Sequence, residues 1–131
     1  MRLLLDTHIA LACIDRRLGD LPLPMASAVE LPENSVWISV VNIWELAIKS
    51  RVGKFSATID LDKWPDAFRL MEIGLQPVLI SHVLADIGPE PPHKDPFDRL
   101  LLGVCAAEGM KLVTRDRALV NHPLAWRPFL S

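Results

Sequence analysis

The sequence predicts an α/β domain, a three-layer α/β/α fold with a short parallel sheet, and three observations support this prediction. Short apolar runs recur along the chain, as expected of strands that are buried on both faces. Segments with helical spacing separate these runs, as connections between parallel strands require. The length of 131 residues is that of one ordinary domain, so we expect a single domain over residues 1–131.

The first half of the chain contains two strand and helix units. RLLL (2–5) is a continuous apolar run that ends at Asp6, and the helical segment after it has Thr7 as its N-cap. A proline-bounded segment then holds a short helix. SVWIS (35–39) alternates like a strand, and VVNIWELAIKSRVG (40–53) predicts a helix that ends at its last glycine.

The second half continues this alternation. A proline opens the next helix, a short apolar run follows it, and a proline-rich loop precedes the last long helix. The predicted elements are a helix at 65–74, a strand at 76–81, a short helix at 82–88, a helix at 97–109, a strand at 111–114, a brief helix from Asp116 and a tail around 125–130.

The stretch HKDPFDRLL (93–101) brings two aspartates to the start of one predicted helix. Pro96 suits the first helical position, because an N–H there would have no partner, and Asp95 is then the N-cap. Asp98 falls in the first turn, where a carboxylate faces the positive end of the helix dipole. Helix capping alone therefore explains both residues.

Composition limits the classes of protein. Half of the residues are hydrophobic and the mean hydropathy is +0.26, which excludes disorder and indicates apolar surface beyond the needs of one core. The formal net charge of −2 gives no overall attraction for nucleic acid, so such binding needs a local basic cluster or a metal ion. No apolar stretch approaches the roughly 20 residues of a membrane span. Cys13 and Cys105 are typical of core residues in a reducing compartment, so we expect a soluble, cytoplasmic protein.

Acidic residues stand where a parallel sheet forms its ligand crevice, at the carboxyl ends of strands. Asp6 ends the first strand, Asp98 opens the helix before the last strand, and Asp116 follows that strand. Glu45 lies inside an apolar helix, where an unpaired carboxylate is costly to bury. Turns, helix caps and an i,i+4 pair with Lys49 explain these acids one at a time. Together they would repel one another, and a fold tolerates that best with Mg²⁺ or Mn²⁺ among them.

Four motifs carry a resemblance: LLLDTHIAL, ISVVNIWELAIKSRVGKF, HKDPFDRLLLGVCAAEG and KLVTRD, which together span nearly the whole chain. In this order they resemble the PIN-domain family, and specifically its VapC-type toxin ribonucleases of bacterial type II toxin–antitoxin pairs. The resemblance implies supporting roles for Thr7 and Thr114, whereas Asp95 matches no acidic position and supports the site as a helix cap. It implies a PIN-like fold with a catalytic, metal-binding quartet at Asp6, Glu45, Asp98 and Asp116.

The activity implied by this resemblance is that of an endoribonuclease. Mg²⁺ or Mn²⁺ would assist hydrolysis of an RNA phosphodiester and leave a 5′-phosphate and a 3′-hydroxyl. The implied partners are RNA, a cognate antitoxin that occludes the site, and a second copy in a homodimer. Basic residues beside the acids either contact RNA phosphates or form ordinary surface salt bridges. They are Lys49, Lys94, Arg99, Arg115 and Arg117.

Other classes fit the motifs less well. A receiver or a haloacid-dehalogenase-like phosphatase needs a second acid near the first strand, and LLLDTH has one. The histidines lack metal-ligand spacing and a nucleophile partner, so we interpret them as loop or cap residues: His8, His82, His93 and His122. The alternative to the ribonuclease is a non-catalytic PIN-like module that binds RNA or a protein.

Overall fold

The centre of the fold is a four-stranded parallel sheet. The computed structural model describes residues 1–128, so the end of the predicted tail lies outside the described residues. The strands lie in the order β3-β2-β1-β4, and every neighbouring pair is parallel. They are β1 (Arg2–Leu5), β2 (Ser35–Ser39), β3 (Gly74–Gln76) and β4 (Lys111–Val113). The predicted α/β fold with a short parallel sheet is confirmed.

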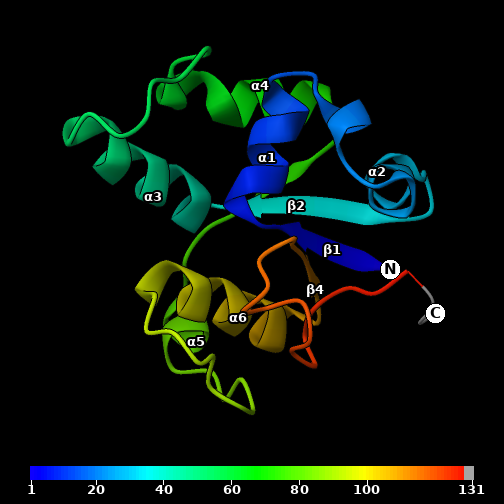
Figure 1. Ribbon diagram of the computed structural model, residues 1–131, viewed down its shortest axis with the longest axis vertical. Coiled ribbons are helices and arrows are strands. Elements are labelled where there is room, and N and C mark those ends of the chain that lie inside the picture. The colour runs from blue at the N-terminus through cyan, green and yellow to red at the C-terminus, as the bar shows by residue number, and fades with distance from the viewer. Residues whose placement is uncertain (129–131) are drawn as a thin grey trace.

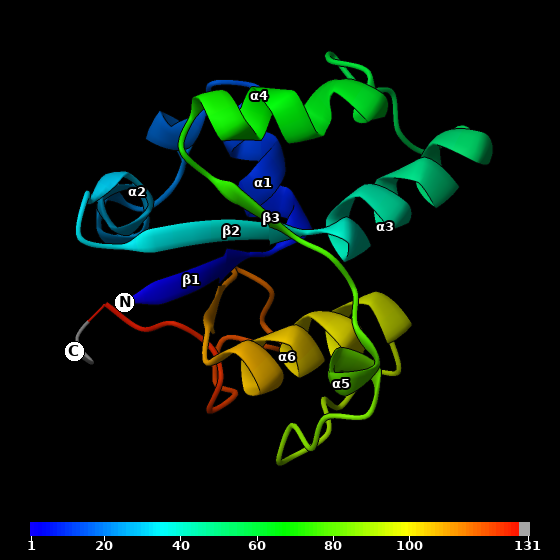
Figure 2. The same cartoon turned by 180° about the vertical axis from the view of Figure 1, so that it is seen from behind.

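Helices cover both faces of the sheet. They are α1 (Thr7–Ile14), α2 (Leu23–Glu30), α3 (Val40–Arg51), α4 (Trp64–Leu70), α5 (Ile80–Val83) and α6 (Pro96–Glu108), with short 3₁₀ helices η1 (Leu18–Asp20) and η2 (Leu61–Lys63). Helices α1, α2 and α4 lie on one face and α5 and α6 on the other, while α3 continues from the end of β2 (Figures 1 and 2). Within residues 1–128, no helix has both the length and the apolar character needed to cross a bilayer.

The residues of β1 alternate between two hydrophobic clusters. Leu3 and Leu5 pack with α1 and α4, whereas Leu4 packs with α6, and all three are fully buried. Side chains alternate across a strand, so the unbroken leucine run reflects helical cover on both faces. Cys13 and Cys105 are free thiols, one in each cluster, as predicted for core residues.

The third strand differs from its prediction. The expected strand at 76–81 is wrong: β3 stops before Pro77, and α5 then occupies part of that range. Proline has no N–H to donate to a neighbouring strand, so pairing ends there. The first residue of the strand is Gly74. A side chain is excluded there, because a Cβ at this position would lie 2.5 Å from the Trp37 ring.

Several helix ends also differ from the sequence prediction. The N-cap of α1 is Asp6, not Thr7, and the helix stops before Arg16, whose φ is +57°. Likewise α4 ends before Glu72, whose φ is +61°, because a residue in the left-handed region breaks the α-helical hydrogen-bond pattern. The brief helix expected from Asp116 is a hydrogen-bonded turn.

Candidate active site

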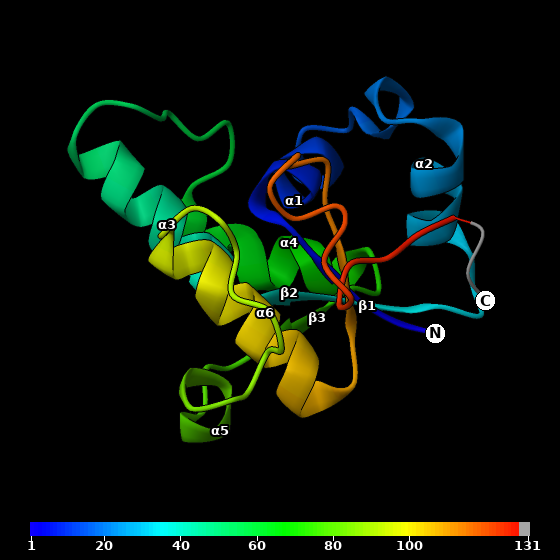
Figure 3. The same cartoon turned by 60° about the horizontal axis from the view of Figure 1, so that its bottom comes forward.

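The four predicted acids lie at the carboxyl edge of the sheet. Asp6 follows β1 directly, and Asp116 follows β4 after two intervening residues. Asp98 is in the first turn of α6, and Glu45 is in α3, which begins where β2 ends. Figure 3 shows α3 beside α6, and the two helices are in contact. The topology therefore delivers all four acids to one region, as the parallel sheet predicts.

Asp6 is buried and held by hydrogen bonds at both carboxylate oxygens. Its Oδ1 accepts the Thr7 backbone N–H at 2.7 Å, and its Oδ2 accepts the Thr114 hydroxyl at 2.6 Å. Burial raises the pKa of Asp6, the hydrogen bonds oppose that rise, and the Glu45 carboxylate adds to it. The position of Asp6 is therefore fixed, although its charge is unfavourable there.

Glu45 is also buried and engaged at both oxygens. Its Oε1 accepts the Thr7 hydroxyl at 2.8 Å, and its Oε2 pairs with Lys49 Nζ at 2.6 Å. The Asn42 amide donates to the Leu5 carbonyl and to the Thr7 hydroxyl, each at 3.1 Å, and so ties α3 to the end of β1. Sequence reasoning missed Asn42; the available signal was its position three residues after Ser39, which caps α3.

Asp95 and Asp98 have separate roles at the start of α6. Asp95 Oδ1 accepts the backbone N–H groups of Phe97 and Asp98 at 2.9 and 3.2 Å, so Asp95 is the N-cap and Pro96 follows it, as predicted. Asp98 Oδ2 instead lies 2.8 Å from His93 Nε2.

The pKa of Asp98 shows that the acids act on one another. Burial, and then the charges of Asp95, Asp6 and Asp116, raise the pKa of Asp98 to about 7, while His93 lowers it. Burial makes the largest contribution, and the three neighbouring carboxylates add to it. The ionised form of Asp98 is therefore disfavoured in the metal-free protein.

Thr114 connects Asp6 with Asp116. Its hydroxyl donates to Asp6 and accepts the Asp116 backbone N–H at 3.0 Å. Asp116 Oδ1 accepts the Ala118 N–H at 2.9 Å, and its Oδ2 lies 3.6 Å from His93 Nε2. The side chain of Asp116 is 38% exposed, so this acid borders solvent.

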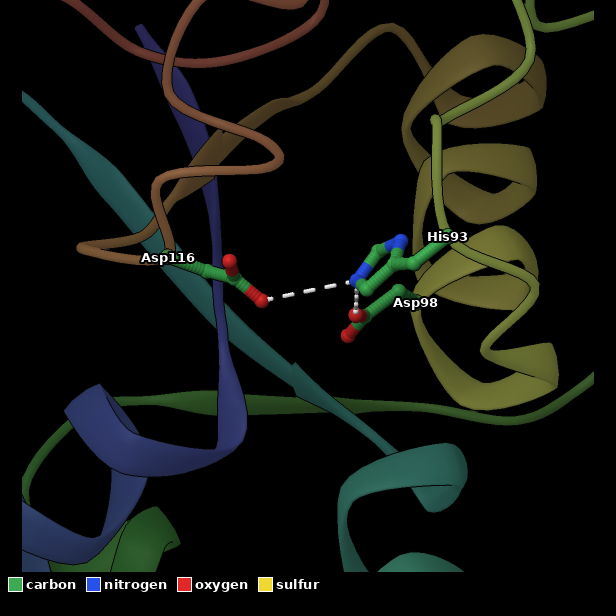
Figure 4. Close-up of side chains that lie close together, drawn as sticks. All are labelled: His93, Asp98 and Asp116. Carbon is green, nitrogen blue, oxygen red and sulfur yellow. Dashed lines mark ion pairs between the residues drawn. The ribbon is translucent and has the colours of Figure 1, made fainter.

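His93 is the unexpected member of this site (Figure 4). It points between Asp98 and Asp116, and the ligand atoms of these three residues lie within 4.8 Å of one another. Burial disfavours the charged ring, but the carboxylates of Asp98 and Asp116 outweigh that effect and raise the pKa of His93. The sequence prediction that His93 is merely a loop residue gave it no role beside the acids. Its place two residues before the N-cap of α6 was the available signal.

The basic residues fall into two groups. Lys94, Arg115 and Arg117 are exposed, and Arg115 lines a groove of about 530 Å³ together with Asp6 and Asp116. Lys49 and Arg99 are engaged within the protein. Lys49 pairs with Glu45, whereas Arg99 Nη2 donates to the Ala85 carbonyl at 2.8 Å and Arg99 Nε lies 3.6 Å from Glu90.

The donor set suits a divalent cation. Carboxylate oxygens are the ligands that Mg²⁺ and Mn²⁺ prefer, and Asp98 and Asp116 supply them beside Asp6. Two buried ring nitrogens of His93 have no hydrogen-bond partner, so the site has unused bonding capacity. The residues present therefore fit the metal that the sequence predicts.

A parallel sheet between helical layers, with acids gathered at the carboxyl ends of its strands, defines an α/β domain whose candidate site lies at that edge. A profile of the PIN domain matches residues 3–123, and the chain belongs to the PIN-domain family. Members of this family are typically nucleases and generally metal-dependent.

A solved structure has a similar fold. The crystal structure of VapBC2 from Rickettsia felis bound to a DNA fragment from their promoter matches with a TM-score of 0.56 and 17% identity. The match covers 95% of this chain and 96% of that chain. At this identity, the likeness concerns the fold. A search of curated proteins found no match.

Proposed function

We propose that this PIN domain is a cation-dependent endoribonuclease and the toxin of a type II toxin–antitoxin pair. The observation that carries the proposal is the convergence of side chains at the carboxyl edge of the sheet: ligand atoms of Asp98, Asp116 and His93 lie within 4.8 Å of one another, and Asp6 and Glu45 are buried there as well. Burying such a cluster is unfavourable unless a positive group joins it. A bound cation would be that group, and a metal-dependent ribonuclease requires one. The PIN-domain match supports the same reaction class.

The acids have distinct proposed roles. Asp6, Asp98 and Asp116 would hold Mg²⁺ or Mn²⁺, and Glu45 completes the quartet from α3. When bound, the cation would polarise phosphoryl oxygens and lower the pKa of a water molecule.

The frame around the acids keeps them in position. Thr7 bonds to Glu45, and Thr114 bonds to Asp6, so these two hydroxyls hold carboxylates in place. Asn42 links the same frame to the end of β1. Well-positioned groups of this kind contribute to catalysis because little reorganisation is needed when the substrate binds.

RNA contacts are proposed for the exposed basic residues. Lys94, Arg115 and Arg117 flank the acids and can bind phosphates on either side of the scissile bond. Lys49 and Arg99 already have partners within the protein, so we assign them structural roles. The expected products carry a 5′-phosphate and a 3′-hydroxyl, as the family resemblance implies: water attacks the phosphorus, the bond to the 3′ oxygen breaks, and that oxygen leaves as the hydroxyl.

A protein partner is proposed for the exposed apolar surface around α5. Leu79, Ile80, Val83 and Leu84 are 47 to 78% exposed, which is unusual for a cluster of large apolar side chains. An antitoxin and a second copy of the chain are the proposed partners, and the cytoplasm is the proposed compartment. The Rickettsia felis structure is that of a VapBC2 complex with promoter DNA.

The test compares RNA cleavage by the native protein with that by Asp6→Asn. Asparagine still caps a helix but removes the charge, so the fold should persist while Mg²⁺-dependent cleavage is lost. Asp66→Asn is the matched control, because Asp66 is an exposed acid on α4 that pairs with Arg69. Cleavage of structured RNA by the native protein and the control, but not by Asp6→Asn, is expected. RNA binding without metal-dependent cleavage would favour the non-catalytic module.

A further inference from the structure

We propose that His93 is a nitrogen ligand of the cation and makes the site prefer Mn²⁺ to Mg²⁺. This inference rests on the proposed cation site and specifies its metal selectivity. The sequence resemblance assigns the site to four carboxylates, and none of its motifs gives His93 a role. The structure adds an imidazole at the centre of that group (Figure 4).

The position of the ring supports ligation. His93 Nε2 lies 2.8 Å from Asp98 Oδ2 and 3.6 Å from Asp116 Oδ2. Two ligand atoms that share a cation at about 2.1 Å and at right angles lie about 3 Å apart. The two separations fall on either side of that value, so His93 Nε2 is spaced from each carboxylate about as neighbouring ligands are.

In the metal-free chain, His93 Nε2 pairs with the Asp98 carboxylate at 2.8 Å. Nε2 and Nδ1 are nevertheless buried atoms that lack an aligned hydrogen bond. A hydrogen bond needs alignment as well as proximity. The pair is therefore held by charge and proximity, in an arrangement that a cation between the two groups can replace.

The two buried histidines elsewhere in the protein show what satisfied rings look like. His82 Nδ1 accepts the Leu79 N–H at 3.0 Å, and its Nε2 meets Glu108 at 2.8 Å. His122 uses both nitrogens as well, toward the Leu124 N–H and the Pro89 carbonyl. His93 differs from both because neither of its nitrogens makes an aligned hydrogen bond, and its Nε2 faces the acids of the candidate site.

The local sequence fixes the start of α6 next to His93. Pro91, Pro92 and Pro96 limit the backbone at their own positions and at the residue before each, so the chain is restricted on both sides of His93. Asp95 then caps α6 through two backbone N–H groups. The capped start of the helix therefore positions Asp98, and His93 lies two residues before the cap.

The chemical consequence is selectivity. Mg²⁺ favours oxygen ligands, whereas imidazole suits divalent transition metals. A site with His93 beside Asp98 and Asp116 has a mixed oxygen and nitrogen donor set. We therefore expect tighter binding of Mn²⁺ than of Mg²⁺, and we expect this preference to depend on the imidazole.

The test is electron spin-echo spectroscopy of Mn²⁺ bound to the full chain, prepared with ¹⁵N-labelled histidine and with unlabelled histidine. Coupling to a histidine nitrogen is expected in the native protein and should disappear in His93→Gln and His93→Ala. Calorimetric titration should show Mn²⁺ affinity falling about tenfold or more, with Mg²⁺ affinity changing by less than about threefold. His8→Ala is the matched control, because His8 is exposed beside Asp6 and should leave the nitrogen coupling intact.

The outcomes separate this inference from the proposed function. Mn²⁺ binding without histidine coupling, or tighter Mn²⁺ binding by both His93 variants, would mean that the cation displaces the ring, and only the inference fails. No binding of either cation by the native protein overturns the cation site and the inference together. Circular dichroism of both His93 variants establishes that they are folded, and glutamine retains a polar side chain where alanine does not.

Discussion

The two halves of the acidic cluster differ in how their polar atoms are satisfied. On the β1 and α3 side, Asp6 and Glu45 each have a partner at both carboxylate oxygens. On the α6 and β4 side, Asp98 and Asp116 face His93, and its ring nitrogens have no hydrogen-bond partner. The first half is a preorganised frame, and the second half retains capacity to bind.

This difference indicates a division of roles. Hydrogen bonds that fix a carboxylate in advance reduce the reorganisation needed later, but they also use part of the bonding capacity of its oxygens. A fold that satisfied all four acids internally would leave little for a cation, and one that satisfied none would be unstable. The frame stabilises the cluster, and Asp98 and Asp116, whose ion pairs are with His93, retain capacity for a cation.

The largest expected effect is on the second half of the cluster. Asp98→Asn keeps the size of the side chain and removes its charge, so we expect RNA cleavage to fall by at least about a hundredfold while the fold persists. Cleavage assays with Mg²⁺ and with Mn²⁺, together with circular dichroism, measure this. Activity within a few-fold of native would show that Asp98 is not part of the reaction.

Asp95→Ala is the matched change on the same helical turn. Asp95 caps α6, so its loss should cost about 1 kcal/mol of stability and leave cleavage largely intact. Urea denaturation measures the first effect and the cleavage assay the second. Equal losses of activity from the two variants would place Asp95 in the site.

The next effect is on the frame. Thr114→Val removes a hydroxyl that donates to Asp6 and accepts from the Asp116 N–H, leaving both without that partner. We expect a loss of about 1 to 3 kcal/mol in stability and about a tenfold to hundredfold loss of cleavage. Thr58→Val is the control, since Thr58 donates to Asp15 at 2.6 Å on the exposed surface. Similar losses from both variants would refute a special role for the frame.

The metal-free protein should be more stable in mild acid. The pKa of Asp98 is about 7 when folded and about 3.9 when unfolded, so the folded state binds more protons between these values. The free energy of unfolding should therefore decrease as pH rises from 4 to 7. The pKa of Asp6 is also raised, so Asp6 contributes a decrease in the same direction. Urea denaturation in EDTA at several pH values measures this slope.

Two comparisons sharpen that pH prediction. Asp98→Asn should flatten the slope, because asparagine does not titrate. Mn²⁺ or Mg²⁺ should restore stability above pH 7, because cation binding favours the ionised carboxylates. If the slope is unchanged in Asp98→Asn, groups other than Asp98 cause the pH dependence of stability.

The frame and the second half of the cluster also differ in how far the sequence predicts them. Caps and short buried strands depend on neighbouring residues, so Asp95, Pro96 and the run 2–5 could be placed directly. The acids could be brought to one edge because parallel strands share a direction. The hydrogen bond from Thr114 to Asp6 joins residues 108 positions apart, and local pattern carries no signal of it.

His93 was missed for a related reason. Its role depends on the conformation of a proline-rich loop, not on a spacing between ligands within one element. The third strand was misplaced because an apolar run was given more weight than Pro77, which cannot donate a hydrogen bond to the sheet. In both cases the deciding factor was the path of the backbone around proline.

The smallest expected effect separates the basic residues that face solvent from those used inside the fold. Arg115 is exposed in the groove with Asp6 and Asp116, whereas Arg99 donates to the Ala85 carbonyl and lies near Glu90. Arg115→Ala should weaken RNA binding a few-fold and reduce the salt dependence by about 0.7 per lost phosphate contact. Arg99→Ala should leave that slope unchanged and lower stability instead, because a buried carbonyl loses its donor.

Fluorescence anisotropy of labelled RNA over a range of KCl concentrations measures the slope, in an Asp98→Asn background that prevents cleavage. The neutralised background itself reduces repulsion of RNA, so both arginine variants must be compared within it and not with the native protein. A reduced slope in Arg99→Ala and an unchanged slope in Arg115→Ala would reverse the assignment. RNA would then lie along α5 and α6, outside the groove at the carboxyl edge of the sheet.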